Sequence, residues 1–155
     1  MSDDHVIYDE AEYHFGGEAF PADLPERQAF VHTGMYLGWI IDRGLFSESF
    51  AQEAAEEIAG FRSGQLSGTD IYERWDGALV GEMLSEEGNA FSGWYYDMDR
   101  GRYLKDYHAL LGRGLPSLYQ VADTRANYER IRDRIDERFA SWKKGRSKKF
   151  WEFWK

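Results

Sequence analysis

Histidine is the first side chain to consider for catalysis or metal binding, and this sequence contains four: His5, His14, His32 and His108. Their spacing gives neither an HxxxH pair nor the HExxH zinc signature. His14 lies near Glu12 and Glu18, and two histidines with carboxylates would suit a divalent metal if His14 met His32 in space. Single histidines beside aromatic residues are more often packed, hydrogen-bonded residues than ligands. We therefore predict no metal and no cofactor.

Other catalytic patterns are weak. The chain has no cysteine, which excludes thiol nucleophiles and thiolate metal sites, and it has no GxSxG motif. The glycine pair in FGGEAF leads to proline, not to the helix N-terminus and lysine of a phosphate-binding loop. With 28 acidic residues, a close carboxylate pair carries little information. We predict no catalytic residue, and the alternative of a small enzyme or metal-binding protein using His14, His32 and nearby carboxylates stays open.

Charge is distributed very unevenly along the 155 residues. Residues 1–99 hold 21 acids and 4 bases, whereas residues 100–155 hold 7 acids and 15 bases, for a net charge of −9. The halves could attract each other within one fold, or an acidic face could attract a basic partner. As partner-binding residues we predict carboxylates and an amide with two aromatic anchors: Glu12, Glu18, Asp23, Glu82, Glu86, Glu87, Asn89, Trp94 and Tyr95.

The elements that must position these residues are mainly helical. Apolar spacing predicts a central hydrophobic helix over 26–43, with further helices near 49–61, 69–76 and 124–142. Residues 84–112 indicate two short helices with a break near 99–101, and short β pairing could occur around 6–8 and 118–121. We predict an all-α bundle of five or six helices, with an irregular N-terminal segment at 1–25, a helical domain at 26–142 and a tail at 143–155.

Two pairs of glycines indicate where the backbone turns tightly or packs closely. Gly34 and Gly38 lie four apart on the central helix, which predicts close packing of a neighbouring element. In EYHFGGEAFPADLP, Gly16 and Gly17 suit a tight turn in a structural segment.

The tail KKGRSKKFWEFWK could stack on nucleic-acid bases or meet a membrane, but the overall negative charge of the protein opposes binding to phosphate. We favour self-docking, a protein partner or homo-oligomer contact for it.

The N-terminus lacks the features of a secretory signal, and no stretch approaches the ~18 consecutive apolar residues of a spanning helix. We therefore predict a cytoplasmic protein without membrane or direct nucleic-acid binding.

Several ordered phrases resemble a family of small acidic bacterial proteins catalogued as a domain of unknown function. They are YDEAEYHFGG, LPERQAFVHTGMYLGWIIDRGL, LSEEGNAFSGWYYD, YLKDY and LPSLYQVADTRANYERIRDRIDERFASW, spanning roughly 7–142. The resemblance implies no catalytic residue. Such proteins are similar in general character to immunity proteins of polymorphic toxin systems. We therefore predict a non-catalytic, immunity-type inhibitor that binds a cognate toxin with a basic face.

Overall fold

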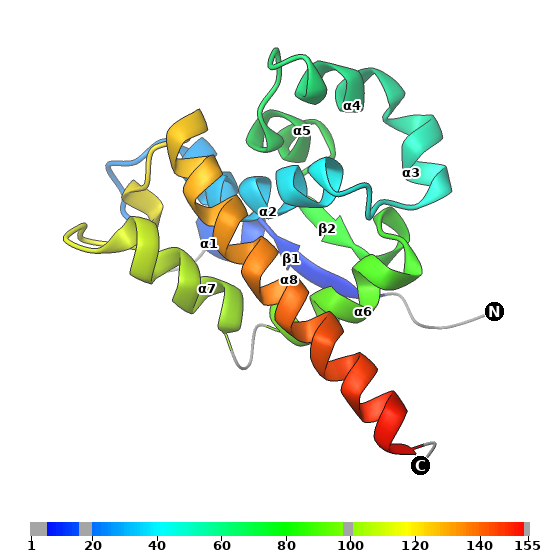
Figure 1. Cartoon of the computed structure of the whole chain (residues 1–155). Helices are drawn as coiled ribbons and strands as arrows, with labels where there is room; N and C mark the ends of the chain where they lie inside the picture. Colours follow the sequence, from blue (N-terminus) through cyan, green and yellow to red (C-terminus); the bar gives the residue numbers. More distant parts are fainter. Residues whose placement is uncertain (1–5, 16–19, 98–100, 154–155) are drawn as a thin grey trace.

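The computed structural model describes residues 6–15, 20–97 and 101–153, with the backbone alone at Phe15 and 147–153. The chain is mostly helical with one small sheet, which confirms the predicted all-α class (Figure 1). In chain order the elements are β1 (Ile7–Glu10), α1 (Glu12–Phe15), η1 (Glu26–Phe30), α2 (Val31–Asp42), α3 (Glu48–Glu53), α4 (Ala55–Arg62), α5 (Gly68–Arg74), β2 (Ala78–Val80), η2 (Gly81–Met83), α6 (Glu86–Tyr95), α7 (Arg102–Tyr107), η3 (His108–Gly112), η4 (Leu118–Gln120) and α8 (Arg125–Phe153).

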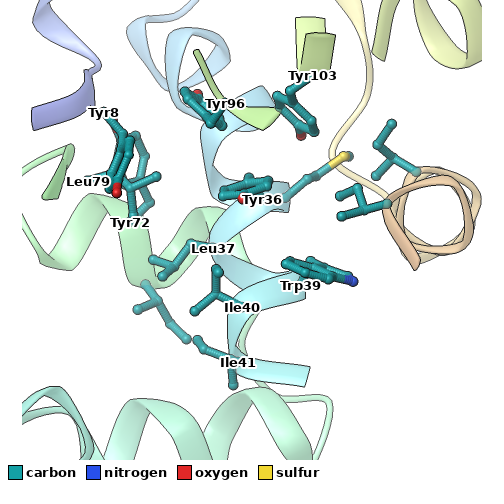
Figure 2. Close-up of a cluster of buried hydrophobic side chains, with 14 of the residues drawn as sticks. Tyr8, Tyr36, Leu37, Trp39, Ile40, Ile41, Tyr72, Leu79, Tyr96 and Tyr103 are labelled. Carbon is teal, nitrogen blue, oxygen red and sulfur yellow. The ribbon is translucent and has the colours of Figure 1, made fainter. Parts of the chain in front are cut away.

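Helix α2 is the centre of the fold, as its sequence predicts. Every residue from Val31 to Ile41 is buried. Figure 2 shows Tyr36, Leu37, Trp39, Ile40 and Ile41 projecting from it into the core. Burial on all sides explains why this segment is apolar around its whole circumference. The predicted helix over 26–43 begins with a 3-10 turn, η1, before the regular α-helix.

Glycines let α2 and α5 approach each other closely. A Cβ built on Gly34 would lie 2.5 Å from the Cα of Thr69, and one on Gly68 would lie 2.0 Å from the carbonyl oxygen of Gly34. Gly38 faces the rings of Phe61 and Tyr128, 3.1 Å from such a Cβ. This arrangement confirms the close packing predicted from the glycine spacing.

The N-terminal segment is more ordered than predicted. Residues Ile7–Glu10 form β1, which pairs antiparallel with β2 through Ile7–Val80, Asp9–Leu79 and Glu10–Ala78, with an irregularity between Ile7 and Asp9. This strand overlaps the β pairing predicted around 6–8, in a segment otherwise predicted to be irregular. The β pairing predicted around 118–121 was wrong, since Leu118–Gln120 is a 3-10 turn. A three-residue β2 is too short to show the alternation that identifies strands.

Helix boundaries follow local capping. The Ser47 hydroxyl accepts a hydrogen bond from the Phe50 amide at 3.1 Å, so α3 begins before residue 49, the predicted start. The predicted single helix over 49–61 is divided at Ala54 into α3 and α4. Ser67 makes a full capping box with Asp70, so α5 begins at Gly68, just before the predicted start at 69. Gly101, at φ 64°, precedes α7 near the predicted break.

Helix α8 is longer than predicted. Thr124 caps it by accepting a hydrogen bond from the Asn127 amide at 3.1 Å, and the helix continues through residue 143 to Phe153. The predicted tail thus begins inside α8, and in Figure 1 its C-terminal end extends beyond the other elements. The described part of the chain contains no helix whose length and hydrophobicity together would let it span a bilayer.

Candidate functional site

Three side chains that sequence separates come together where β1, α1 and α2 meet. His14 Nε2 lies 2.9 Å from Asp9 Oδ1 and 3.2 Å from His32 Nε2. His32 Nε2 lies 3.4 Å from Asp9 Oδ2. We call this group the Asp9–His14–His32 centre; one ligand atom from each residue lies within 4.8 Å of the others.

Backbone structure brings the centre together. Strand pairing places Asp9 opposite Leu79 inside the molecule, and the Ala11 amide donates a 2.7 Å hydrogen bond to the Gly77 carbonyl just before α1 begins. His32 occupies the second position of the buried helix α2, and the Tyr103 hydroxyl donates to its carbonyl at 2.5 Å. The ligand side chains are therefore held by packed elements rather than by exposed loops.

The Asp9 carboxylate is held by further donors. The hydroxyls of Thr33 and Tyr96 each donate to Oδ2 at 2.8 Å, and the Glu10 amide donates to Oδ1 at 2.9 Å. These contacts fix both carboxylate oxygens and direct the side chain toward the two imidazoles.

The two imidazoles are oriented by different neighbours. His14 Nδ1 is in hydrogen-bond contact with the Tyr119 hydroxyl at 2.8 Å, which directs Nε2 toward Asp9. His32 Nδ1 has no hydrogen-bond partner among the described residues. Its ring is instead held by edge contacts with His14, at 4.4 Å between centroids, and with Tyr107 and Tyr119, at 6.1 Å each.

The centre contains one ionised carboxylate and at least one neutral imidazole. Burial alone raises the pKa of Asp9, but hydrogen bonds from His14 and His32 outweigh it and hold that pKa well below its ordinary value. Burial lowers the pKa of His32, which favours the neutral imidazole with a lone pair to offer. An ionised carboxylate and a neutral imidazole are the forms in which these side chains bind metals.

The separations in the centre match the edges of a coordination polyhedron. With bonds of ~2.0–2.2 Å, neighbouring ligands lie about 2.8–3.1 Å apart in an octahedron and about 3.3–3.6 Å apart in a tetrahedron. Among Asp9 Oδ2 and the two Nε2 atoms the separations are 3.1, 3.2 and 3.4 Å, close to these values. Two histidines and one carboxylate on one face are also a recognised ligand set for first-row transition metals.

The predicted partner-binding residues do not form one site. Five of the predicted carboxylates are exposed: Glu12, Asp23, Glu82, Glu86 and Glu87. Glu86 and Glu87 line a hollow together with Lys143 and Arg146 of α8, whereas Glu82 lines a different groove. Glu18 lies outside the described residues, as do Gly16 and Gly17.

Three further residues that were predicted to contact a partner make contacts within the protein itself. Tyr95 is fully buried, and its hydroxyl donates to Asp106 at 2.6 Å, so its prediction as a surface anchor was wrong. The Asn89 side chain accepts from the Tyr8 hydroxyl at 2.6 Å and donates to the Gly81 carbonyl at 3.0 Å. Trp94 is half-buried, with the Arg102 guanidinium 4.5 Å from its ring centroid.

Sequence reasoning found His14 and His32 but chose the wrong carboxylates. Glu12 is exposed, and the carboxylate that contacts both histidines is Asp9. Tyr96 and Tyr119, which complete the surroundings, were also missed. No periodic pattern identifies them, because their contact with the centre depends on segments 60 to 110 residues apart along the chain.

Comparison with known families gives one result. The family model described as Domain of unknown function (DUF7832) matches residues 7–121. This range holds every residue of the centre and its hydrogen-bond partners, and it ends before α8 and short of the predicted limit at 142. No curated protein and no solved structure shows a significant match.

Proposed function

The chain belongs to the family of the domain of unknown function DUF7832, and within that family we propose that this protein binds one divalent transition-metal ion through Asp9, His14 and His32. One observation carries the proposal: one ligand atom from each of two histidines and one aspartate lies within 4.8 Å of the others. A single cation could therefore contact all three residues.

Burial favours a small ion over an organic substrate. The exposed fractions of the side chains are 1% for Asp9, 10% for His14 and 0% for His32. A metal ion would fit among these three side chains without displacing them. It would enter from the side of His14, the most exposed of the three. Mixed nitrogen and oxygen ligands favour Zn²⁺, Fe²⁺ or Co²⁺ over Mg²⁺ or Ca²⁺, which prefer oxygen ligands alone.

The hydrogen bonds around the centre would serve as outer-shell contacts. If a metal bound Nε2 of His14, the ring proton would sit on Nδ1. The Tyr119 hydroxyl oxygen would then accept a hydrogen bond from Nδ1–H. Thr33, Tyr96 and the Glu10 amide hold the Asp9 carboxylate in its orientation toward the two histidines. Such partners fix ligand orientation and raise affinity in known sites.

Metal analysis of the purified, untagged protein tests the proposal. Protein from defined medium supplemented with zinc, iron or cobalt is expected to hold about one equivalent of metal, released by a chelator. Apoprotein titrated with Co²⁺ is expected to develop the visible d–d absorption of a low-symmetry site. His14→Ala is expected to abolish both signals while circular dichroism shows the same helix content.

The exposed histidine on η3 provides the control. His108→Ala removes an imidazole without touching the centre and is expected to leave metal content and the cobalt spectrum unchanged. Wild-type protein that takes up no stoichiometric metal, or that binds equally well after His14→Ala, would overturn the proposal.

A second function, immunity-type inhibition of a bacterial toxin in the cytoplasm, is favoured by the exposed carboxylates Glu82, Glu86 and Glu87. A basic toxin cleft would be steered to such a surface. Charge reversal at Glu86 and Glu87 is expected to abolish capture of a stoichiometric partner from host extract, while His14→Ala leaves capture intact. Capture that survives the reversal would contradict this function for α6.

A further inference from the structure

A surface groove that shares no residue with the Asp9–His14–His32 centre combines an apolar floor with an acidic rim. It lies between α3, the end of α5 and the β2–η2 segment, and it has a volume of about 360 Å³. Phe50, Trp75 and Met83 contribute to the floor, and Glu53, Asp76 and Glu82 contribute to the rim. Trp75 is the half-buried aromatic residue of the floor, and the buried Phe50 ring supports it with centroids 4.9 Å apart.

The rim gives the groove a defined electrostatic preference. Three carboxylates line it, and among the residues that the structure describes no lysine or arginine contributes to the lining. A ligand for this groove should therefore pair apolar or aromatic side chains for the floor with cationic groups for the rim.

The C-terminal part of α8 has this composition. Residues 143–155, KKGRSKKFWEFWK, contain six bases, one acid and four large aromatic residues. In the described portion, Lys143, Lys144 and Arg146 are all exposed. The aromatic residues at 150, 151, 153 and 154 have the three- and four-residue spacing by which helices dock into apolar grooves.

Geometry directs this segment toward another molecule. Helix α8 is continuous through Phe153 and carries its C-terminal end away from the other elements (Figure 1). Helix α8 packs against α2, α6, α7 and η3, whereas the groove is lined by residues of α3, β2 and η2, so a continuous α8 does not lead to the groove of its own molecule. The groove of a second copy can receive the segment with the helix intact.

We propose that two copies of this protein pair reciprocally, each placing the C-terminal segment 147–155 in the acidic groove of the other. A two-fold arrangement uses both grooves and both segments and so leaves neither exposed. This pairing does not depend on metal, because it shares no residue with the Asp9–His14–His32 centre.

Sedimentation velocity on the untagged full-length protein over a range of concentrations and salt tests the pairing. Wild type is expected to form a dimer that weakens as salt rises. Glu53→Lys on the rim is expected to raise the dissociation constant about tenfold or more, the effect of losing ~1.4 kcal/mol. Glu56→Lys is the matched control: it makes the same charge change at an exposed position three residues away, outside the groove.

Charge exchange makes the test specific. Lys149→Glu is expected to weaken the dimer like Glu53→Lys, and combining the two is expected to restore it, because the opposite charges then meet again. A monomer at every concentration would overturn the proposal and leave the groove to a different cationic partner or to self-docking. A dimer that Glu53→Lys and Glu56→Lys weaken equally, or not at all, would also overturn it.

Discussion

The Nε2 atoms of His14 and His32 lie 3.2 Å apart, although 18 residues separate the two histidines in the sequence. Neither nitrogen is directed to solvent, and both face the same buried carboxylate, Asp9. A cation placed among these groups would contact both nitrogens and the carboxylate at once.

Tyr119→Phe removes the hydroxyl next to His14 Nδ1 and leaves the ligand atoms in place. We expect metal affinity to fall about 10- to 100-fold, the usual effect of losing an outer-shell partner, measured by competition with a chromogenic chelator. Tyr13→Phe on α1 is the control, since Tyr13 is 57% exposed. Unchanged affinity after Tyr119→Phe would exclude a role for this hydroxyl in orienting His14.

Metal binding should stabilise the fold, because the centre joins β1 and α1 to α2. At free metal 100-fold above the dissociation constant, the free energy of unfolding is expected to rise by ~2.7 kcal/mol, measured by urea denaturation. Amides of β1 should gain protection from hydrogen exchange at the same time. His14→Ala protein should show neither change when metal is added; an equal gain in that variant would indicate binding elsewhere.

Gly34→Ala should destabilise the protein by about 1–3 kcal/mol, because the added methyl group meets the Thr69 backbone and α5 must move. The matched change Gly93→Ala on α6 has nothing within 4 Å of its Cβ. There the better helix propensity of alanine should stabilise by about 0.5–1 kcal/mol. Thermal denaturation of both variants checks the opposite signs, and a neutral Gly34→Ala would contradict the close approach of α2 to α5.

Asp106 joins three elements, accepting hydrogen bonds from Tyr95 at 2.6 Å and from Arg138 at 2.8 and 2.9 Å. Burial alone raises the pKa of this carboxyl, but Arg138 and Tyr95 outweigh burial and lower the pKa below its ordinary value. Because the folded pKa lies below the unfolded value near 3.9, the carboxylate stabilises the fold fully at neutral pH. This contribution is lost as pH falls below about 4.

Asp106→Asn should therefore cost about 1–2 kcal/mol at pH 7, a modest value because the Arg138 side chain is 46% exposed. The cost should shrink toward pH 3, because the carboxyl of the unfolded chain takes up a proton there and an ionised carboxylate in the fold then stabilises less. Urea denaturation at both pH values measures it, with Asp133→Asn, at a side chain 72% exposed, as the control. A cost independent of pH would mean that shape, not charge, matters at this position.

Features that depend on neighbouring residues could be read from the sequence. The apolar circumference of residues 31–41 predicted a buried central helix, and the pair Gly34 and Gly38 predicted close packing, because helical periodicity reports burial directly. Helix starts near 69 and 124 were predicted closely, since capping, here by Ser67 and Thr124, depends on the next three residues. The division at Ala54 and the three-residue β2 were missed because local periodicity in these segments is too short to be distinctive.

Tertiary structure decided the candidate site. Sequence proximity suggested Glu12 and Glu18 as neighbours of His14, but strand pairing of β1 with β2 turns Asp9 inward instead. Tyr96 and Tyr119 reach the centre only after α6 and η4 have packed against α2. Composition and periodicity determine which segments are helical and which faces are buried, because these follow from local energetics. Which polar side chains meet inside depends on contacts between distant segments, and only the packed fold fixes those.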